Sequence, residues 1–227
     1  MAKAEKHTLK LEIEKPQYIT VNDVTYAQVD SWFGHCRRDL KLDIIYPEAQ
    51  DGRTYPCILW ICGGAWLMMD KSAHNLYLSR LASGGFVVAS VEYRTSNQGP
   101  YPMPFAGCKG SDPLSESACG PVPYQQEQSG VMGESAGGYR TVWLRLDHDP
   151  ALDVGEYLEE SSEVQAACPW YPPTDLSAFP CESAEQCASS AESLLLGFNS
   201  KRNREKAYNC SPVSKVTKDA PPFLIIH

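Results

Sequence analysis

The sequence has no long apolar run. No stretch of about 18 consecutive apolar residues occurs, so a membrane-spanning helix is not predicted. The first residues, MAKAEKH, lack the apolar core of a signal peptide. These two absences predict a globular cytoplasmic protein with no membrane partner.

Basic residues are also scarce. Lys and Arg number 20 against 28 Asp and Glu, which gives a net charge of −8 and a pI of about 5.1. Affinity for nucleic acids depends mainly on Lys and Arg, which neutralise phosphates and release counterions. No run of such residues occurs here, so no nucleic-acid partner is predicted.

Paired cysteine motifs are missing as well. The nine cysteines include no C-x-x-C pair, which argues against a zinc ribbon or a thioredoxin-like site. Cys57, Cys62 and Cys168 lie in or beside apolar runs, as buried free thiols do. Only Cys181 and Cys187 have a loop spacing that suggests a disulfide. No metal, nucleotide or flavin motif occurs, so we expect no cofactor.

The apolar runs that are present alternate with a helical pattern. Residues 39–46 alternate as a half-buried strand does, and residues 57–61 are continuously apolar, as in a strand covered on both faces. A helix is predicted over 71–83, ending at Gly84-Gly85, and a second buried strand over 86–91. Strand, helix and strand form a βαβ unit. With later apolar runs at 164–170 and 223–226, the pattern predicts an α/β fold with a mostly parallel, doubly wound sheet.

Residues 99–130 do not fit this pattern. They hold six prolines and five glycines, where a parallel sheet needs a crossover helix. If synonymous codons are chosen and read one nucleotide later, Gly107–Glu116 can encode D-V-K-A-A-I-R-Y-L-R, which has a helical apolar period. We infer a compensated frameshift over about residues 105–129. The alternative is a genuine Pro-rich insertion or lid.

Two glycine-rich motifs follow predicted strands. GESAG at residues 133–137 matches G-x-S-x-G and opens a predicted helix over 136–146, a context that exposes the serine hydroxyl above the sheet. ICGGAW at residues 61–66 ends the first buried strand, where backbone N–H groups can face a reacting carbonyl oxygen. Together the two motifs indicate a serine hydrolase. Arg140 and Arg145 are unusual in a helix that should pack on the sheet.

With these motifs the sequence resembles the α/β-hydrolase superfamily, in the esterase and lipase group near the bifunctional feruloyl and acetyl-xylan esterases. The matching segments are ICGGAW (61–66), VEYR (91–94), VMGESAGGY (131–139), YPPTDL (171–176), Ser211-Pro212 and APPFLIIH (220–227). The resemblance implies an α/β-hydrolase fold. Residues 1–38 would form an extension with the first strands, and residues 39–227 the hydrolase domain.

The resemblance assigns roles to single residues. It makes Ser135 the nucleophile within an elbow formed by Gly133, Glu134 and Gly137. It also makes the N–H groups of Ala136, Gly64 and either Gly63 or Ala65 the oxyanion hole. Cys62 stands where the family usually has a structural His, and Ala65 replaces a glycine, which restricts the backbone.

The resemblance further implies that an Asp or Glu and then a His complete the triad in segments after residues 223–226. Both would lie beyond His227, so we expect the sheet to be incomplete at the C-terminus and this 227-residue chain to be inactive. The chain's own histidines are expected to be surface or packing residues: His7, His35, His74, His148 and His227.

The resemblance implies that the substrate is a small-molecule or polysaccharide ester, such as an acetyl or feruloyl ester of a plant polysaccharide, hydrolysed through an acyl-enzyme. Two alternatives stay open: a serine peptidase of the prolyl-oligopeptidase kind, which would lack its propeller repeats here, and a vestigial α/β-hydrolase that binds without catalysis. The oligomeric state is left open.

Overall fold

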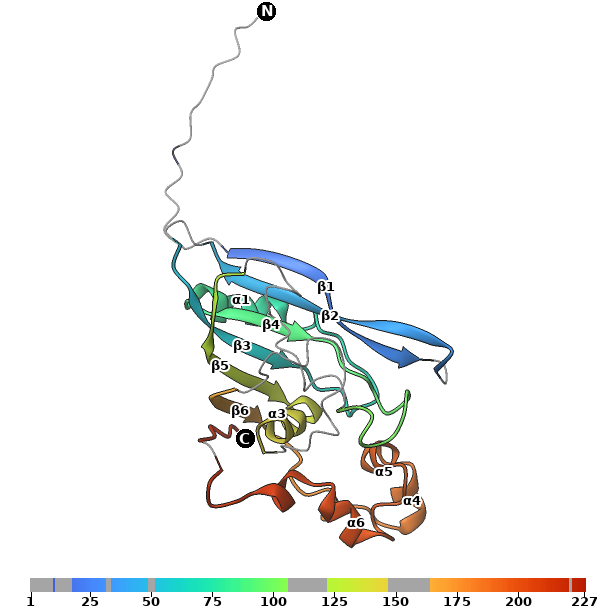
Figure 1. The fold of residues 1–227 in the computed structure, drawn as a ribbon. Helices are drawn as coiled ribbons and strands as arrows, with labels where there is room; N and C mark the ends of the chain where they lie inside the picture. The colour runs from blue at the N-terminus through green and yellow to red at the C-terminus, as the bar shows by residue number, and fades with distance from the viewer. Residues whose placement is uncertain are drawn as a thin grey trace, which may run out of the picture.

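A computed structural model of the chain describes residue 10 and residues 18–31, 34–48, 52–105, 122–146, 164–220 and 222–227. Six strands form one sheet in the order β1-β2-β4-β3-β5-β6 (Figure 1). The strands are β1 (Tyr18–Ser31), β2 (Cys36–Pro47), β3 (Tyr55–Ile61), β4 (Val87–Val91), β5 (Tyr124–Glu134) and β6 (Ala166–Trp170). The helices are α1 (Asn75–Ser83), α3 (Ala136–Leu146), α4 (Ala184–Ala188), α5 (Ala191–Leu196), α6 (Arg204–Asn209) and the 3₁₀ helix η3 (Pro212–Lys215).

The sheet is mixed but parallel at its centre. β3 pairs in parallel with both β4 and β5, and β5 pairs in parallel with β6. β1 and β2 join the other edge as antiparallel strands. All five residues of β4 are buried, which is why this segment reads as an uninterrupted apolar run. The predicted α/β fold with a mostly parallel sheet is confirmed.

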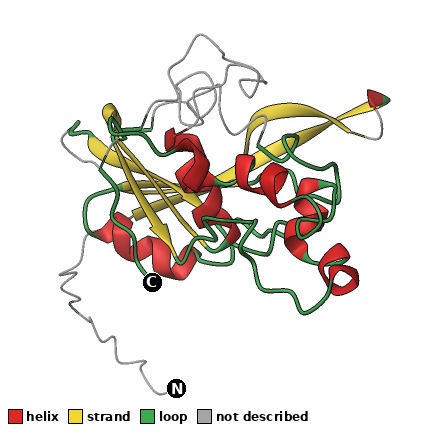
Figure 2. Cartoon of the chain, turned by 90° about the horizontal axis from the view of Figure 1, so that it is seen from below, coloured by secondary structure: helices red, strands yellow, loops and turns green. Residues whose placement is uncertain are grey.

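Helices cover both faces of the sheet (Figure 2). Leu78 and Ala82 of α1 pack with Ile58 and Trp60 of β3 on one face. Cys57 and Ile61 point to the other face, as the two-residue period of a strand requires. The helix α3 contacts β5 and β6 and places the GESAG motif at the carboxyl ends of these strands. In the described ranges, no helix is both long and apolar enough to cross a bilayer.

Two predicted elements differ most from the structure. The helix expected over 71–83 begins only at Asn75, because Lys71 and Ser72 lie in a turn where their side chains reach Asp43 of β2. Residues 223–226 follow β6 in parallel but form only two isolated bridges instead of a strand.

A proline explains the broken pairing at this edge. Leu224 N donates to Ala167 O, and Ile226 N donates to Pro169 O. The intervening bond of a parallel ladder would run from the N–H of residue 169 to Leu224 O, and Pro169 has no N–H. Leu224 and Ile225 remain 64% and 60% exposed.

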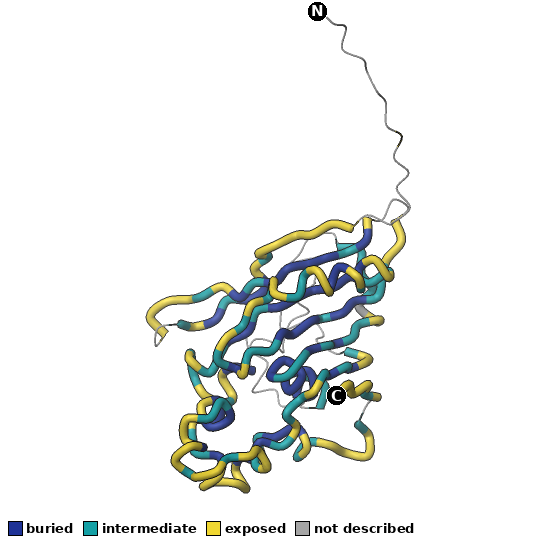
Figure 3. Tube along the Cα trace, turned by 180° about the vertical axis from the view of Figure 1, so that it is seen from behind, coloured by how far each residue is buried: buried dark blue, intermediate teal, exposed yellow. Residues whose placement is uncertain are grey.

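A small helical lobe, α4 to α6, follows β6 and packs beside α3 through a second core (Figure 1). Leu195 and Ala207 of the lobe are buried with Tyr139 and Trp143 of α3 and with Trp66. The outer side of the lobe is exposed, while the central strands and α3 are buried (Figure 3). Cys181 and Cys187, the pair singled out from the sequence, are joined by a disulfide in this lobe.

Most of the block with the inferred frameshift, residues 106–121, lies outside the described residues. The crossover between β4 and β5 therefore stays a prediction. Tyr124–Ser129, which fall inside the inferred range, form the first part of β5, where Tyr124 pairs with Tyr55.

Candidate active site

Ser135 lies on a sharp turn between β5 and α3. The strand ends at Glu134 and the helix begins at Ala136, so one residue makes the whole turn. Its φ is +49°, a left-handed conformation that costs a non-glycine residue about 1–3 kcal/mol and is characteristic of functional sites. Ser135 N donates to Trp170 O at 2.9 Å, which fixes the turn against the end of β6.

The elbow glycines allow α3 to approach the sheet closely. A Cβ at Gly137 would overlap Ile61 O and lie 2.6 Å from Cys62 O. A Cβ at Gly133 would lie 2.7 Å from both Ile61 O and Thr141 Oγ1. The motif therefore needs glycines because backbone from β3 lies where side chains would be.

The loop after β3 lies next to the serine. A Cβ placed on Gly63 would be 3.3 Å from Ser135 Cβ, so this backbone borders the space above the hydroxyl. Leu67 N and Met68 N both donate to Gly64 O, which folds the loop into a tight turn. Gly64, Ala65 and Trp66 all have positive φ, at +128°, +54° and +59°. The two motifs predicted to form one site are brought together.

The VEYR segment supports this loop. Tyr93 is buried, and its hydroxyl donates to Cys62 O at 2.9 Å and to Gly63 O at 3.2 Å. Ser96 N donates to Trp66 O, and the Trp66 ring packs edge-on against Tyr139 of α3. The loop after β3 is thus held in place by the segment after β4 and by α3. Burial raises the pKa of the Cys62 thiol to about 11, so this residue stays a neutral packing group.

Arg140 also ties α3 to the segment after β4. The side chain is buried, with its guanidinium 3.9 Å from the centroid of the Tyr93 ring and 4.8 Å from that of Phe105. Nη2 donates to Arg94 O and Nη1 to Pro104 O. The arginine that is unusual in the sequence therefore connects α3 to the segment after β4 at two points.

Ala65 has a strained backbone conformation at a position where the esterase family that this sequence resembles has glycine. An alanine at φ +54° has a conformational energy penalty that a glycine does not have. Glycine in turn increases the entropy of the unfolded chain, which offsets part of this gain. We therefore expect Ala65→Gly to raise the free energy of unfolding by a net amount of about 0.5–1 kcal/mol. Urea unfolding measures this difference. Ala82→Gly, inside the helix α1, is the matched control and should lower stability by at least about 1 kcal/mol. Equal losses in both variants would contradict the strain at Ala65.

Glu134 is at the centre of a polar cluster that sequence reasoning missed. Its Oε1 accepts from Gly63 N at 3.4 Å and lies 3.3 Å from His74 Nε2, while its Oε2 accepts from the Tyr171 hydroxyl at 2.5 Å. This hydrogen bond to Glu134 raises the pKa of Tyr171 to about 12. His74 was expected to be only a surface or packing residue. It does pack on the Trp60 ring, but it also faces this carboxylate.

No described side chain hydrogen-bonds the Ser135 hydroxyl. His35, His74 and His227 all lie in the described ranges, and none of them reaches it. His7 and His148 lie outside the described residues. A proton acceptor for Ser135 is therefore not assigned within the described part of the chain.

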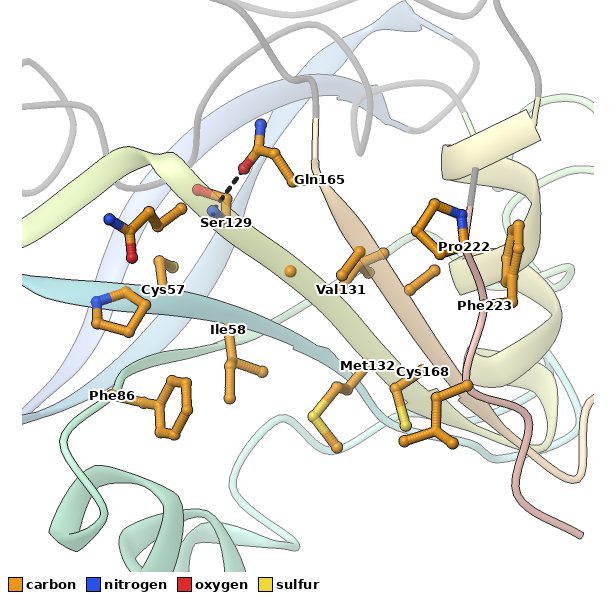
Figure 4. Close-up of a pocket in the computed structure, with 16 residues that line it drawn as sticks. Cys57, Ile58, Phe86, Ser129, Val131, Met132, Gln165, Cys168, Pro222 and Phe223 are labelled. Carbon is orange, nitrogen blue, oxygen red and sulfur yellow. Dashed lines mark hydrogen bonds between the residues drawn. The ribbon is translucent and has the colours of Figure 1, made fainter. Parts of the chain in front are cut away.

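A hollow lies along the same sheet (Figure 4). It has a volume of about 520 Å³ and lies between β3, β5, β6 and the segment after residue 221. Ile58, Phe86 and Phe223 line it, and Ser129 N donates to Gln165 Oε1 at its rim. The lining of this apolar groove ends at Met132 on β5 and does not include Ser135.

Comparison with known proteins agrees with this geometry. The sequence profile of the BD-FAE family matches residues 42–227. The chain belongs to the BD-FAE family. It is 27% identical over 202 residues to the probable carboxylic ester hydrolase LipM of Mycobacterium tuberculosis, covering 87% of this chain and 46% of LipM. Esterase LipC of the same organism is 24% identical, with 82% of this chain and 47% of LipC covered. The chain thus spans about half the length of these curated relatives.

Solved structures show the same fold for this BD-FAE chain. A bifunctional GH43-CE protein of Bacteroides eggerthii has a TM-score of 0.75 at 25% identity, over 92% of this chain and 28% of that one. A truncated carbohydrate esterase from gut microbiota has a TM-score of 0.74 at 25% identity, over 96% of this chain and 79% of that one. These relatives are described as esterases or as a probable carboxylic ester hydrolase, and the chain shares the α/β-hydrolase fold with the solved esterase structures.

Proposed function

We propose that Ser135 is the nucleophile of a carboxylic ester hydrolase whose substrates are acetyl or feruloyl esters of plant polysaccharides. The observation that carries the proposal is the strained Ser135 turn with the glycine loop beside it. The ester class is supported by the relatives, of which one is described as a carbohydrate esterase and another as a carboxylic ester hydrolase.

The geometry supports an acyl-enzyme mechanism. Ser135 Oγ would attack the ester carbonyl carbon, and the carbonyl oxygen would take up negative charge. The N–H of Ala136, at the first residue of α3, and the N–H groups of the loop after β3 would donate to this oxyanion. The alcohol would leave with a proton, and water would then hydrolyse the acyl-Ser135 ester.

Turnover also needs a base for the Ser135 proton. Because the described part of the chain brings no imidazole to the hydroxyl, we expect the 227-residue polypeptide to hydrolyse aryl acetates only weakly. The oxyanion hole and substrate binding alone give about 10³- to 10⁴-fold over water. Robust turnover would mean that an unforeseen base serves Ser135.

A single-event reaction tests the nucleophile without requiring turnover. In an aryl phosphonate ester, Ser135 Oγ would bond to phosphorus while the aryloxide leaves with the electron pair and the serine proton passes to solvent. We expect one aryloxide released per chain and the added mass on the peptide that holds Ser135. Ser135→Ala should abolish this adduct, because the hydroxyl is the attacking group.

Ser189→Ala is the matched control, since this serine caps the end of α4 in the remote lobe. It should be labelled like the unchanged chain. An adduct that persists in Ser135→Ala, or one mapped to another serine, would remove Ser135 from its role. Absence of any adduct in the unchanged chain would favour a vestigial binding protein.

A further inference from the structure

Glu134 is tied to three separate segments at the carboxyl edge of the sheet. Gly63 N donates to it from the loop after β3. His74, at the start of α1, lies 3.3 Å from it, and the Tyr171 hydroxyl donates to it from the turn after β6. The Glu134 side chain is only 19% exposed. Its carboxylate is therefore held mainly by the Gly63 and Tyr171 donors, with His74 beside it.

The contact with Gly63 decides where that N–H points. A backbone N–H that donates to Glu134 Oε1 cannot also point at an oxygen above Ser135. The sequence motif alone left Gly63 and Ala65 as alternative donors. On the basis of the proposed function, we propose that Glu134 is a positioning residue. Its carboxylate accepts the hydrogen bond from Gly63 N–H, so this N–H is not available to the oxyanion. The oxyanion would then be bound by the N–H groups of Gly64, Ala65 and Ala136.

The same bonds also fix the loop relative to the nucleophile. Glu134 directly precedes Ser135 in the chain, so a hydrogen bond from Gly63 to its side chain joins the oxyanion loop to the elbow itself. Tyr171 completes the arrangement with a backbone held at φ +35° and a 2.6 Å bond from its N–H to Ile226 O. The hydroxyl therefore reaches Glu134 from a constrained turn. A carboxylate with these donors around it opposes a nearby oxyanion less than a bare one.

Phosphonate labelling of the full chain separates the roles of the acceptor and the charge. Glu134→Ala removes the acceptor, so Ser135 should be labelled at least about tenfold more slowly, because mispositioned donors no longer meet the phosphonyl oxygen. Glu134→Gln keeps a side-chain oxygen for Gly63 N–H and should stay within about twofold of the unchanged rate. Equal rates for all three proteins, or Glu134→Gln as slow as Glu134→Ala, would overturn the proposal.

Two readouts do not depend on reactivity. Hydrogen exchange at the Gly63 amide should speed up at least about tenfold in Glu134→Ala and stay slow in Glu134→Gln, since an opened hydrogen bond exposes the amide. Near pH 11, the ultraviolet spectrum of Glu134→Ala should show one further tyrosinate per chain, because Tyr171 returns toward its ordinary pKa of about 10. Glu134→Ala/Tyr171→Phe should lack that extra signal.

The outcomes separate this proposal from the proposed function. An adduct that still forms in Ser135→Ala would contradict the assignment of Ser135 as the nucleophile. The Gly63 exchange rate and the Tyr171 spectrum would still test the role of Glu134. An unchanged Gly63 exchange rate in a folded Glu134→Ala variant would contradict the positioning role of Glu134 but not the nucleophile assignment of Ser135. If Glu134→Ala does not fold, the variant Tyr171→Phe tests the proposal instead. We then expect Ser135 to be labelled more slowly while the free energy of unfolding in urea stays within about 1 kcal/mol of the unchanged chain. An unchanged labelling rate would overturn the proposal.

Discussion

Replacing Gly137 with alanine is expected to be severely destabilising. The new methyl group would overlap Ile61 O and approach Cys62 O to 2.6 Å, and both atoms belong to backbone that cannot rotate away. Either α3 must move off the sheet or β3 must shift. We expect a loss of about 3 kcal/mol or more in the free energy of unfolding, measured by urea titration. Labelling of Ser135 should fall by about 100-fold, because the elbow moves with the helix.

Gly130→Ala is the matched control for this variant. Gly130 lies on β5, the strand that leads into the Ser135 turn, and the atoms nearest to an added Cβ are 3.6 and 3.9 Å away, which is ordinary contact. The same methyl group should therefore change stability by no more than about 0.5 kcal/mol. Similar losses at Gly130 and Gly137 would mean that close helix approach is not the reason for the elbow glycines.

Asp43→Asn is the second variant with a large expected effect. Asp43 is 1% exposed and accepts from Lys71 Nζ and Ser72 Oγ at 2.7 Å, from Asp23 N at 3.0 Å and from Asn75 Nδ2 at 3.4 Å. Neutralising it leaves the Lys71 ammonium, with a side chain 11% exposed, facing an amide. Breaking a buried pair in this way costs about 3 kcal/mol, which urea unfolding at neutral pH would detect.

The stability contributed by the pair of Asp43 and Lys71 depends on pH in a defined direction. Burial raises the pKa of Asp43, but the hydrogen bonds from Lys71 and its other donors outweigh burial and leave the pKa below its ordinary value. The unfolded chain then binds the proton more tightly, so this stabilisation is present above about pH 4 and is lost as the pH falls through the folded-state pKa. The raised pKa of Lys71 limits the other side: its contribution is present below about pH 10.4 and is lost at higher pH.

Asp23→Asn is the control for this pair. Asp23 also lies 3.0 Å from Lys71, but its side chain is 64% exposed, and asparagine tolerates its φ of +59°. An exposed ion pair contributes about 1 kcal/mol or less. If Asp23→Asn were as costly as Asp43→Asn, or if Asp43→Asn kept the full acid-side slope, burial of the pair would not explain the effect.

The central sheet and the elbow were predictable from sequence because local signals determine them. Buried parallel strands require apolar runs, and a strand-to-helix turn with a close backbone approach requires glycines at fixed spacing. The strands at 57–61 and 86–91 and the helix over 136–146 were therefore predicted to within two residues. The extra residues of β1 and β2 were missed, because their exposed edge carries polar side chains without a strong pattern.

The polar cluster at Glu134 could not be predicted in the same way. His74 and Tyr171 are separated from Glu134 by 60 and 37 positions in the sequence (134 − 74 and 171 − 134), and only the sheet order brings their loops together. A partial signal was present: the residue before the nucleophile is acidic and stands at the end of an apolar strand, where a charge needs donors. The broken pairing at residues 223–226 had a local signal in Pro169, which lies inside the neighbouring strand.

Arg140 couples the folding of the two halves of the site. A guanidinium is a cation, so burying it without its partners in place would leave an unpaired charge in the core. Those partners are the Arg94 and Pro104 carbonyls and the Tyr93 and Phe105 rings, all from residues 93–105. The helix α3 and this segment are therefore expected to reach their folded positions together. Because Tyr93 in that segment also holds the glycine loop, nucleophile and oxyanion donors would form in one cooperative step.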